Sequence, residues 1–370
     1  MKPLLILLKP IFRSVFRNII LFLVRILVVK LLLYKKINMK KLFPILLLLG
    51  SINLFSQNLV EDFEIQIQNR GLKSNFNKII VLDSRLDTTN VGVIQKGAFN
   101  RKAFLKAKVP LNNQIENVFK ALIQSDAKEG ELVLNLRDYK FTEITEAFSE
   151  TGYCYLRADL FVKKESGYEK IDFIDRVFEV NAMDVTKKNI RNGSEKLIQF
   201  IEGNLMSFKI GEAYTFDEIK NISNIEKRKT PVYNTNIYVD GIYKDFESFK
   251  NQIPSSREYK VTRNKKNVIT KLEGVSDGVA FKVDTDFIYC LIDQGKIYLI
   301  QKNLFVPVEF KDDDFYFKGR AKVTAKTGDV VLASAFFGII GGALASNATS
   351  EFLMKIDHQN GATVQVTELK

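Results

Sequence analysis

Apolar residues at helical and alternating spacing organise the first part of the chain, residues 75–207. Two groups of apolar residues at helical spacing predict amphipathic helices, one opened by Pro110 at its first helical position and one near residue 190. Between them, alternate residues at 132–136 and 154–162 predict strands, and residues 168–180 predict another. We expect both helices to pack on one side of a mostly antiparallel sheet, which is an α+β domain. The helical positions are Leu111, Ile115, Val118, Phe119 and Leu122, and then Ile190, Leu197, Ile198, Ile201 and Leu205.

The second part, residues 208–370, is richer in strand patterns. Short β-branched and aromatic runs between residues 268 and 310 are separated by glycine-containing turns, which predicts an antiparallel meander. Asp240-Gly241 between apolar runs predicts a hairpin, and Thr215 with Glu218 forms a capping-box pattern for a short helix. The predicted fold class is therefore α+β: a mostly antiparallel sheet with two helices, followed by a β-rich domain with short helices.

Residues 39–56 have the pattern of a secretory signal peptide. Two lysines precede an apolar run that is too short to span a bilayer, and small and polar residues follow it. Cleavage after Ser56 would leave Gln57 as the mature N-terminus, with residues 57–74 as a linker. The sequence thus predicts export to the periplasm or cell envelope, or secretion.

Residues 1–38 allow two interpretations. They form either a basic membrane segment or an extension produced by a misassigned upstream start, and we favour the second because Arg and Lys interrupt every apolar run.

The basic charge of the chain lies mainly in this leader. The whole chain has 55 Lys and Arg against 43 Asp and Glu, for a net charge of +12. Ten of the basic residues and none of the acidic ones precede Gln57, so the remainder is close to neutral. A nucleic-acid partner is not expected, because it requires a basic patch within the folded domain.

Cys154 and Cys290 lie in separate apolar, alternating stretches. An exported protein can join two cysteines in a disulfide. We favour two buried free thiols, because an unpaired Cys behaves as a small core hydrophobe.

The strand at residues 78–82 runs into Asp83, Arg85 and Asp87, and the next predicted strand, at residues 91–94, contains Gly92. This pattern resembles the opening of the YajG-like bacterial envelope lipoproteins, over about 130 residues. The resemblance implies an envelope-associated role without catalysis. The chain lacks the lipidated cysteine, so anchoring is not carried over.

Asp83, Arg85 and Asp87 form a candidate interaction site for a cation or an anionic partner. The alternative, which we favour, is that these charges pair with one another in a solvated turn.

A second resemblance covers about 80 residues of the second domain. It rests on the GIY triplet at residues 241–243, on Phe246, Phe249 and Pro254, and on the GVSDG run at residues 274–278. These residues resemble a module of secreted Bacteroidetes proteins and imply origin and compartment only. Phe246 and Phe249 are expected in the core rather than on a ligand platform.

Residues 330–350 contain no charged residue and include Gly338, Gly341 and Gly342. Their length reaches the transmembrane range, and small residues allow close helix approach in lipid. We favour a buried or re-entrant apolar helical hairpin, and the alternative is membrane insertion or self-association through the small-residue face.

Motifs for catalysis are weak. His358 is the only histidine and is expected in an exposed hairpin turn, and the three aspartates at residues 312–314 lack the alternating spacing of a calcium loop. No metal or cofactor is predicted. We therefore expect a non-catalytic envelope protein that binds a protein partner or the membrane, with a periplasmic hydrolase, carboxylate- or calcium-dependent, as the alternative. Oligomeric state is left open.

If the small-residue face of residues 330–350 mediates association, Gly341→Leu will abolish association and leave the first domain folded. Sedimentation velocity and circular dichroism of the variant test this, and unchanged association would exclude that face.

Overall fold

The computed structural model describes residues 59–66, 69–96, 101–145, 150–183, 185–301, 304–320 and 351–369. Leu59–Lys370 forms one compact unit. The signal peptide, its cleavage site at Ser56 and Gln57, the upstream extension and residues 330–350 with their glycines lie outside the described residues. The division into domains at residue 207 stays a prediction.

The first sheet has eight strands in the order β1-β4-β3-β5-β6-β7-β8, with β2 also paired to β5. β5, β6 and β7 are antiparallel neighbours of 15 or 16 residues each. The strands are β1 (Leu59–Phe63), β2 (Lys78–Asp83), β3 (Gly92–Lys96), β4 (Arg101–Ala107), β5 (Glu131–Thr145), β6 (Glu150–Lys164), β7 (Gly167–Ala182) and β8 (Ala213–Tyr214).

One edge of β5 is shared by two strands. β2 pairs in parallel with its first half, and β3 pairs in parallel with Phe141 and Thr142 further along. A bulge interrupts the β5–β6 register between Leu136 and Asp138, which reverses the alternation of side chains along β5. Leu136 before the bulge and Tyr139 after it consequently both lie in the same apolar core.

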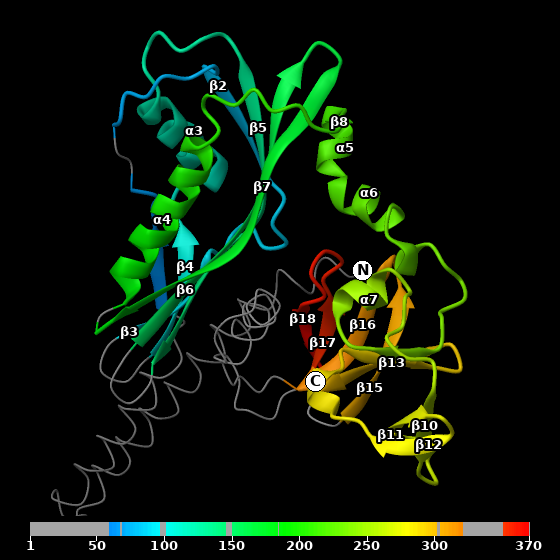
Figure 1. Ribbon diagram of the computed structural model, residues 1–370. Coiled ribbons are helices and arrows are strands. Elements are labelled where there is room, and N and C mark those ends of the chain that lie inside the picture. The colour runs from blue at the N-terminus through cyan, green and yellow to red at the C-terminus, as the bar shows by residue number, and fades with distance from the viewer. Residues whose placement is uncertain are drawn as a thin grey trace, which may run out of the picture. The chain divides into compact units, whose positions relative to one another are not determined.

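Helices α3 (Leu111–Leu122) and α4 (Thr186–Glu202) cover one face of this sheet (Figure 1). The apolar residues expected on α3 are all buried. Pro110 is the N-cap residue, one position before the first helical position that the sequence predicts for it. In α4, Gly193 allows close approach to β5 and β6. A Cβ atom there would lie 2.4 Å from the Phe141 ring and 2.6 Å from the Cys154 sulfur.

The remaining elements form two further sheets and several short helices. The seven-stranded sheet has the order β18-β17-β16-β15-β14-β13-β9 and is antiparallel throughout. The predicted antiparallel meander is therefore confirmed for the runs after residue 287, whereas the runs at residues 268–272 and 279–283 belong to another sheet. A separate three-stranded sheet contains β10, β11 and β12 (Figure 1). The strands are β9 (Gly241–Tyr243), β10 (Tyr259–Arg263), β11 (Ile269–Ser276), β12 (Val279–Lys282), β13 (Cys290–Asp293), β14 (Lys296–Gln301), β15 (Leu304–Lys311), β16 (Asp314–Arg320), β17 (Glu351–Ile356) and β18 (Thr363–Leu369). The helices are α5 (Phe216–Lys220), α6 (Ile222–Arg228) and α7 (Phe246–Lys250), with 3-10 helices at Pro231–Tyr233 and Thr285–Phe287.

The α+β prediction is wrong. The described part of the protein is mostly β, with 48% of its residues in strands against 20% in helices, and it contains large antiparallel sheets and a half-barrel. Both long helices exist, but three strands of 15 or 16 residues and a ten-stranded second half outweigh them.

The hairpin predicted at Asp240-Gly241 is also wrong. β9 begins at Gly241 and pairs with β13, and the residues before Gly241 form no strand. Gly241 has φ 154°, and a Cβ atom there would lie 2.5 Å from Pro254 and 2.7 Å from the Ser256 carbonyl oxygen. This glycine therefore permits a close approach of two chain segments and does not form a turn.

Other local predictions are confirmed. Cys154 and Cys290 are buried and free, and burial raises the pKa of both thiols. Phe246 and Phe249 lie in the core of the second sheet, and the capping box of Thr215 and Glu218 starts α5.

We expect Gly193→Val to destabilise the protein by about 2 kcal/mol, because overpacking of a close contact outweighs the better helix propensity of valine. Urea unfolding at neutral pH measures this change. Arg191→Val, at an exposed position of the same helix, is the matched control and should change the free energy of unfolding by less than about 0.5 kcal/mol. Equal effects of the two substitutions would contradict the packing argument.

Candidate functional site

Charged side chains concentrate on the face of the first sheet opposite the two helices. Arg137 lies at the β5 bulge, Arg157 and Asp159 lie two residues apart on β6, and Asp175 lies on β7. The first three side chains are buried. Buried charges require charged or hydrogen-bonding partners. The elements that supply these partners define the site, which we call the charge cluster: Arg137, Arg157, Asp159, Lys170, Asp175, Glu226, Asp357 and His358.

Arg157 joins the first sheet to the turn between β17 and β18. Its Nη1 donates to Asp357 Oδ2 at 2.7 Å, and its Nη2 donates to Asp357 Oδ1 at 3.3 Å and to Asp175 Oδ2 at 3.1 Å. Asp357 also accepts hydrogen bonds from the backbone N–H groups of Gln359 and Asn360, so one carboxylate both shapes the turn and binds the sheet.

Arg137 makes the corresponding link to helix α6. Its two terminal nitrogens donate to the two oxygens of Glu226 at 2.9 and 2.8 Å, and Nη2 also donates to Ser223 Oγ at 3.0 Å. On its own sheet, Arg137 lies 3.3 Å from Asp159, whose other oxygen is 2.6 Å from Lys170 Nζ. The bidentate geometry between Arg137 and Glu226 is typical of strong guanidinium–carboxylate pairs.

His358 completes the cluster. Its Nε2 lies 2.8 Å from Glu226 Oε2 and 3.4 Å from Arg137 Nη2. A single ring nitrogen cannot donate to the carboxylate and accept from the guanidinium at once, so the shorter contact assigns the proton to Nε2. With its side chain only 10% exposed, His358 is not the solvent-exposed turn residue that the sequence predicts.

Opposing effects set the pKa values of the acids. Burial raises the pKa of Glu226, but hydrogen bonds from His358 and Arg137 and the charge of Arg137 outweigh it and lower the pKa to about 2. Burial likewise opposes the effect of Arg157 on Asp357, and the net pKa of Asp357 is well below its ordinary value. Both carboxylates are therefore ionised at neutral pH and serve as partners for the two arginines.

The predicted site at Asp83, Arg85 and Asp87 forms a self-contained loop. The buried Arg85 guanidinium donates to both Asp83 oxygens at 2.8 Å and to the carbonyl oxygens of Thr88 and Asn90. Asp87 accepts from the backbone N–H and hydroxyl of Thr89. These contacts hold the chain where it passes from β2 to β3 along β5, and they leave the interaction role of the three residues a prediction.

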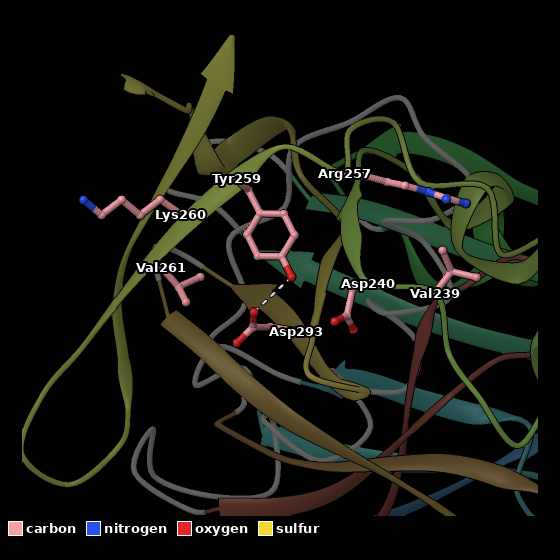
Figure 2. Close-up of a pocket in the computed structure, with 7 residues that line it drawn as sticks. All are labelled: Val239, Asp240, Arg257, Tyr259, Lys260, Val261 and Asp293. Carbon is pink, nitrogen blue, oxygen red and sulfur yellow. Dashed lines mark hydrogen bonds between the residues drawn. The ribbon is translucent and has the colours of Figure 1, made fainter. Parts of the chain in front are cut away.

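An open cavity of about 630 Å³ lies beside strand β10 (Figure 2). Its lining residues are Val239, Asp240, Arg257, Tyr259, Lys260, Val261 and Asp293. The Tyr259 hydroxyl donates to Asp293 at 2.9 Å, and Asp240 accepts from the backbone N–H groups of Gln294 and Gly295. Arg257 and Lys260 point away from the Tyr259–Asp293 pair (Figure 2). The carboxylates of this cavity thus already have donors, and its basic groups do not converge with them.

Within the described ranges there is no group of three or more metal-ligating side chains, and no helix there is long and apolar enough to cross a membrane.

The sequence prediction missed the charge cluster except for His358. Arg157 and Asp159 interrupt an otherwise apolar strand pattern at positions that share one face. That spacing was the available signal, because charged residues two apart within an apolar strand must find partners.

Comparison with known proteins gives little beyond this geometry. No family model and no curated protein matches the chain. Two solved structures are similar over part of it. One is an uncharacterized protein, 12% identical, with 40% of this chain and 96% of that chain covered and a TM-score of 0.22. The other is protein XCC0632 from Xanthomonas campestris, of family-model DUF330, 7% identical, with 40% and 91% covered and a TM-score of 0.26.

We expect Glu226→Gln to lower the free energy of unfolding at pH 7 by about 2–3 kcal/mol, because it removes the carboxylate that accepts from both terminal nitrogens of Arg137 and leaves Asp159, at 3.3 Å, as its carboxylate partner. The folded-state pKa of Glu226 is depressed, so its contribution is present above the unfolded pKa of about 4.3 and is lost as the pH falls towards 2. Urea unfolding between pH 7 and pH 2 should therefore show the difference between wild type and variant shrinking on acidification.

Glu129→Gln, at an exposed position, is the matched control and should follow the wild type. A constant difference between Glu226→Gln and wild type across this pH range would contradict the assignment.

Proposed function

We propose that this protein is a non-catalytic binding or assembly protein exported to the bacterial cell envelope. The observation that carries the proposal is that the charged side chains of the charge cluster bind one another. Its two buried arginines bind carboxylates from α6 and from the β17–β18 turn. These ion pairs join segments that are far apart in the sequence. These acids and arginines bind one another, so their role in the structure is to hold the chain together, which suits a protein that presents surfaces to partners.

The arrangement of the remaining acids supports the same proposal. The carboxylates that a hydrolase would use, Asp83 and Asp87, bind Arg85 and the backbone of their own loop. Export is supported by the signal-peptide pattern of residues 39–56 and by the resemblance of residues 83–92 to YajG-like envelope proteins. The partner is expected to be an envelope protein or the membrane.

Fractionation of the native host with a carbonate wash, followed by the intact mass of the recovered chain, tests export. We expect a form that begins at Gln57. Its retention in the washed membranes would favour membrane association through residues 330–350, and its release would favour a periplasmic or secreted binding protein. A chain that retains residues 1–38 would overturn the export proposal.

A thermal-shift series on the same material tests the non-catalytic part. Stabilisation by Ca²⁺ that is lost in Asp83→Asn or Asp87→Asn would favour the hydrolase instead, whereas association that is sensitive to detergent would favour the binding protein.

A further inference from the structure

Strand β12 is an edge strand with an unusual apolar surface. Among the described residues it pairs with β11 alone, and all four of its residues are exposed. Val279 is 69% exposed and Phe281 is 52% exposed. Edge strands in monomeric proteins are commonly protected by charge, proline or a bulge, because their free backbone groups can pair with another chain. In β12 the only charged residue is Lys282, at its end.

The conformation of β12 is well defined by its neighbours. Asp277 and Gly278 both have positive φ, 52° and 77°, and connect Ser276 to Val279 as a two-residue hairpin turn. The Phe281 ring lies against Gly274 of β11, where a Cβ atom would be 2.3 Å from the ring. The exposed aromatic ring is therefore held in place by the sheet, and it is presented on the same side of β12 as Val279.

The hairpin also fixes which backbone groups of β12 are free. In a two-residue turn the residues that flank it bond to each other, so the N–H and C=O groups of Val279 point towards β11. The groups of the next residue, Ala280, then point away from β11. Ala280 is thus the position at which a further strand can pair with β12 by hydrogen bonds.

We infer that a second copy of this chain occupies the β12 edge in an antiparallel pairing with its two-fold axis at Ala280. This register places Ala280 opposite itself as a hydrogen-bonded pair and places Val279 opposite Phe281 twice, once on each side of the axis. Such close apolar cross-strand pairs stabilise a sheet.

Charge favours the same register. Lys282 of one copy lies opposite Gly278 of the other and next to Asp277, so each end of the paired strands brings a cation beside a carboxylate. Because β12 has only four residues, the contact is smaller than a standard protein interface and the dimer is expected to form at high micromolar concentration. The inference goes beyond the proposed function, because association of the purified chain requires neither export nor an envelope partner.

Cysteine cross-linking tests the register directly. Residues opposite each other in an antiparallel hydrogen-bonded pair have Cα atoms about 5.5 Å apart, within the range of a disulfide. Mild oxidation of Ala280→Cys, in the full chain as its host processes it, should give a covalent dimer that increases with protein concentration. Val268→Cys, exposed on the opposite end of the same sheet, is the matched control and should stay monomeric. The two native cysteines are buried.

Sedimentation equilibrium of the same chain tests the apolar contact. Wild type and Val268→Lys should show the same weak dimer, and Val279→Lys should weaken it at least tenfold while its circular dichroism stays unchanged. The inference is overturned if wild type is monomeric up to about 0.5 mM and Ala280→Cys cross-links no more than Val268→Cys. Binding of another extended peptide at β12 without any self-association would likewise overturn it.

Discussion

The ion pair between Arg157 and Asp357 is the interaction on which the arrangement of the described chain depends most. Arg157 lies on β6, between two neighbouring long strands, where a guanidinium without a carboxylate would be costly. Asp357 meets this requirement from the turn between β17 and β18, and it orders that turn with the same oxygens. The contact between Arg137 and Glu226 repeats this arrangement for α6. Loss of either acid leaves a buried arginine with a carboxylate of its own sheet but without its partner from the helix or the turn, so the sheet, the helix and the turn are stabilised together.

The sequence pattern predicted individual helices and strands better than it predicted the proportion of strand to helix. The apolar face of α3, the meander of the second sheet and the free cysteines were predictable, because each depends on residues close together in the chain. The fold class was not. A strand pattern indicates the presence of a strand but not its length, and β7 has only one fully buried residue in its 16, so its periodicity is weak. The hairpin predicted at Asp240-Gly241 was wrong for a related reason. The same dipeptide can form a turn or can allow a close approach of two chain segments.

The charge cluster shows why sequence patterns alone do not reveal a site built from distant residues. His358 lies beside Asn360 and Gly361, a local pattern that indicates an exposed turn, and its burial arises from Glu226 and Arg137, which are 132 and 221 residues away. Local rules contain no information about such partners. The Arg157 and Asp159 pair on β6 did carry a signal, because two charges on one face of an apolar strand demand compensation. This signal shows that the two charged side chains need partners, but it does not identify those partners.

The separation of 200 residues between Arg157 and Asp357 has a consequence for how the chain acquires its structure during synthesis. Both arginines are made early, while the turn that supplies Asp357 to Arg157 is made about 200 residues later. Until that turn emerges, Arg157 has Asp175 of its own sheet as a partner but lacks Asp357, so this part of the polar face cannot reach its final packing. A chain that crosses a membrane from its N-terminus would therefore lack this ion pair until the turn with Asp357 had crossed. Loss of the segment that contains Asp357 would have the same effect as loss of the ion pair, however well the first sheet had formed.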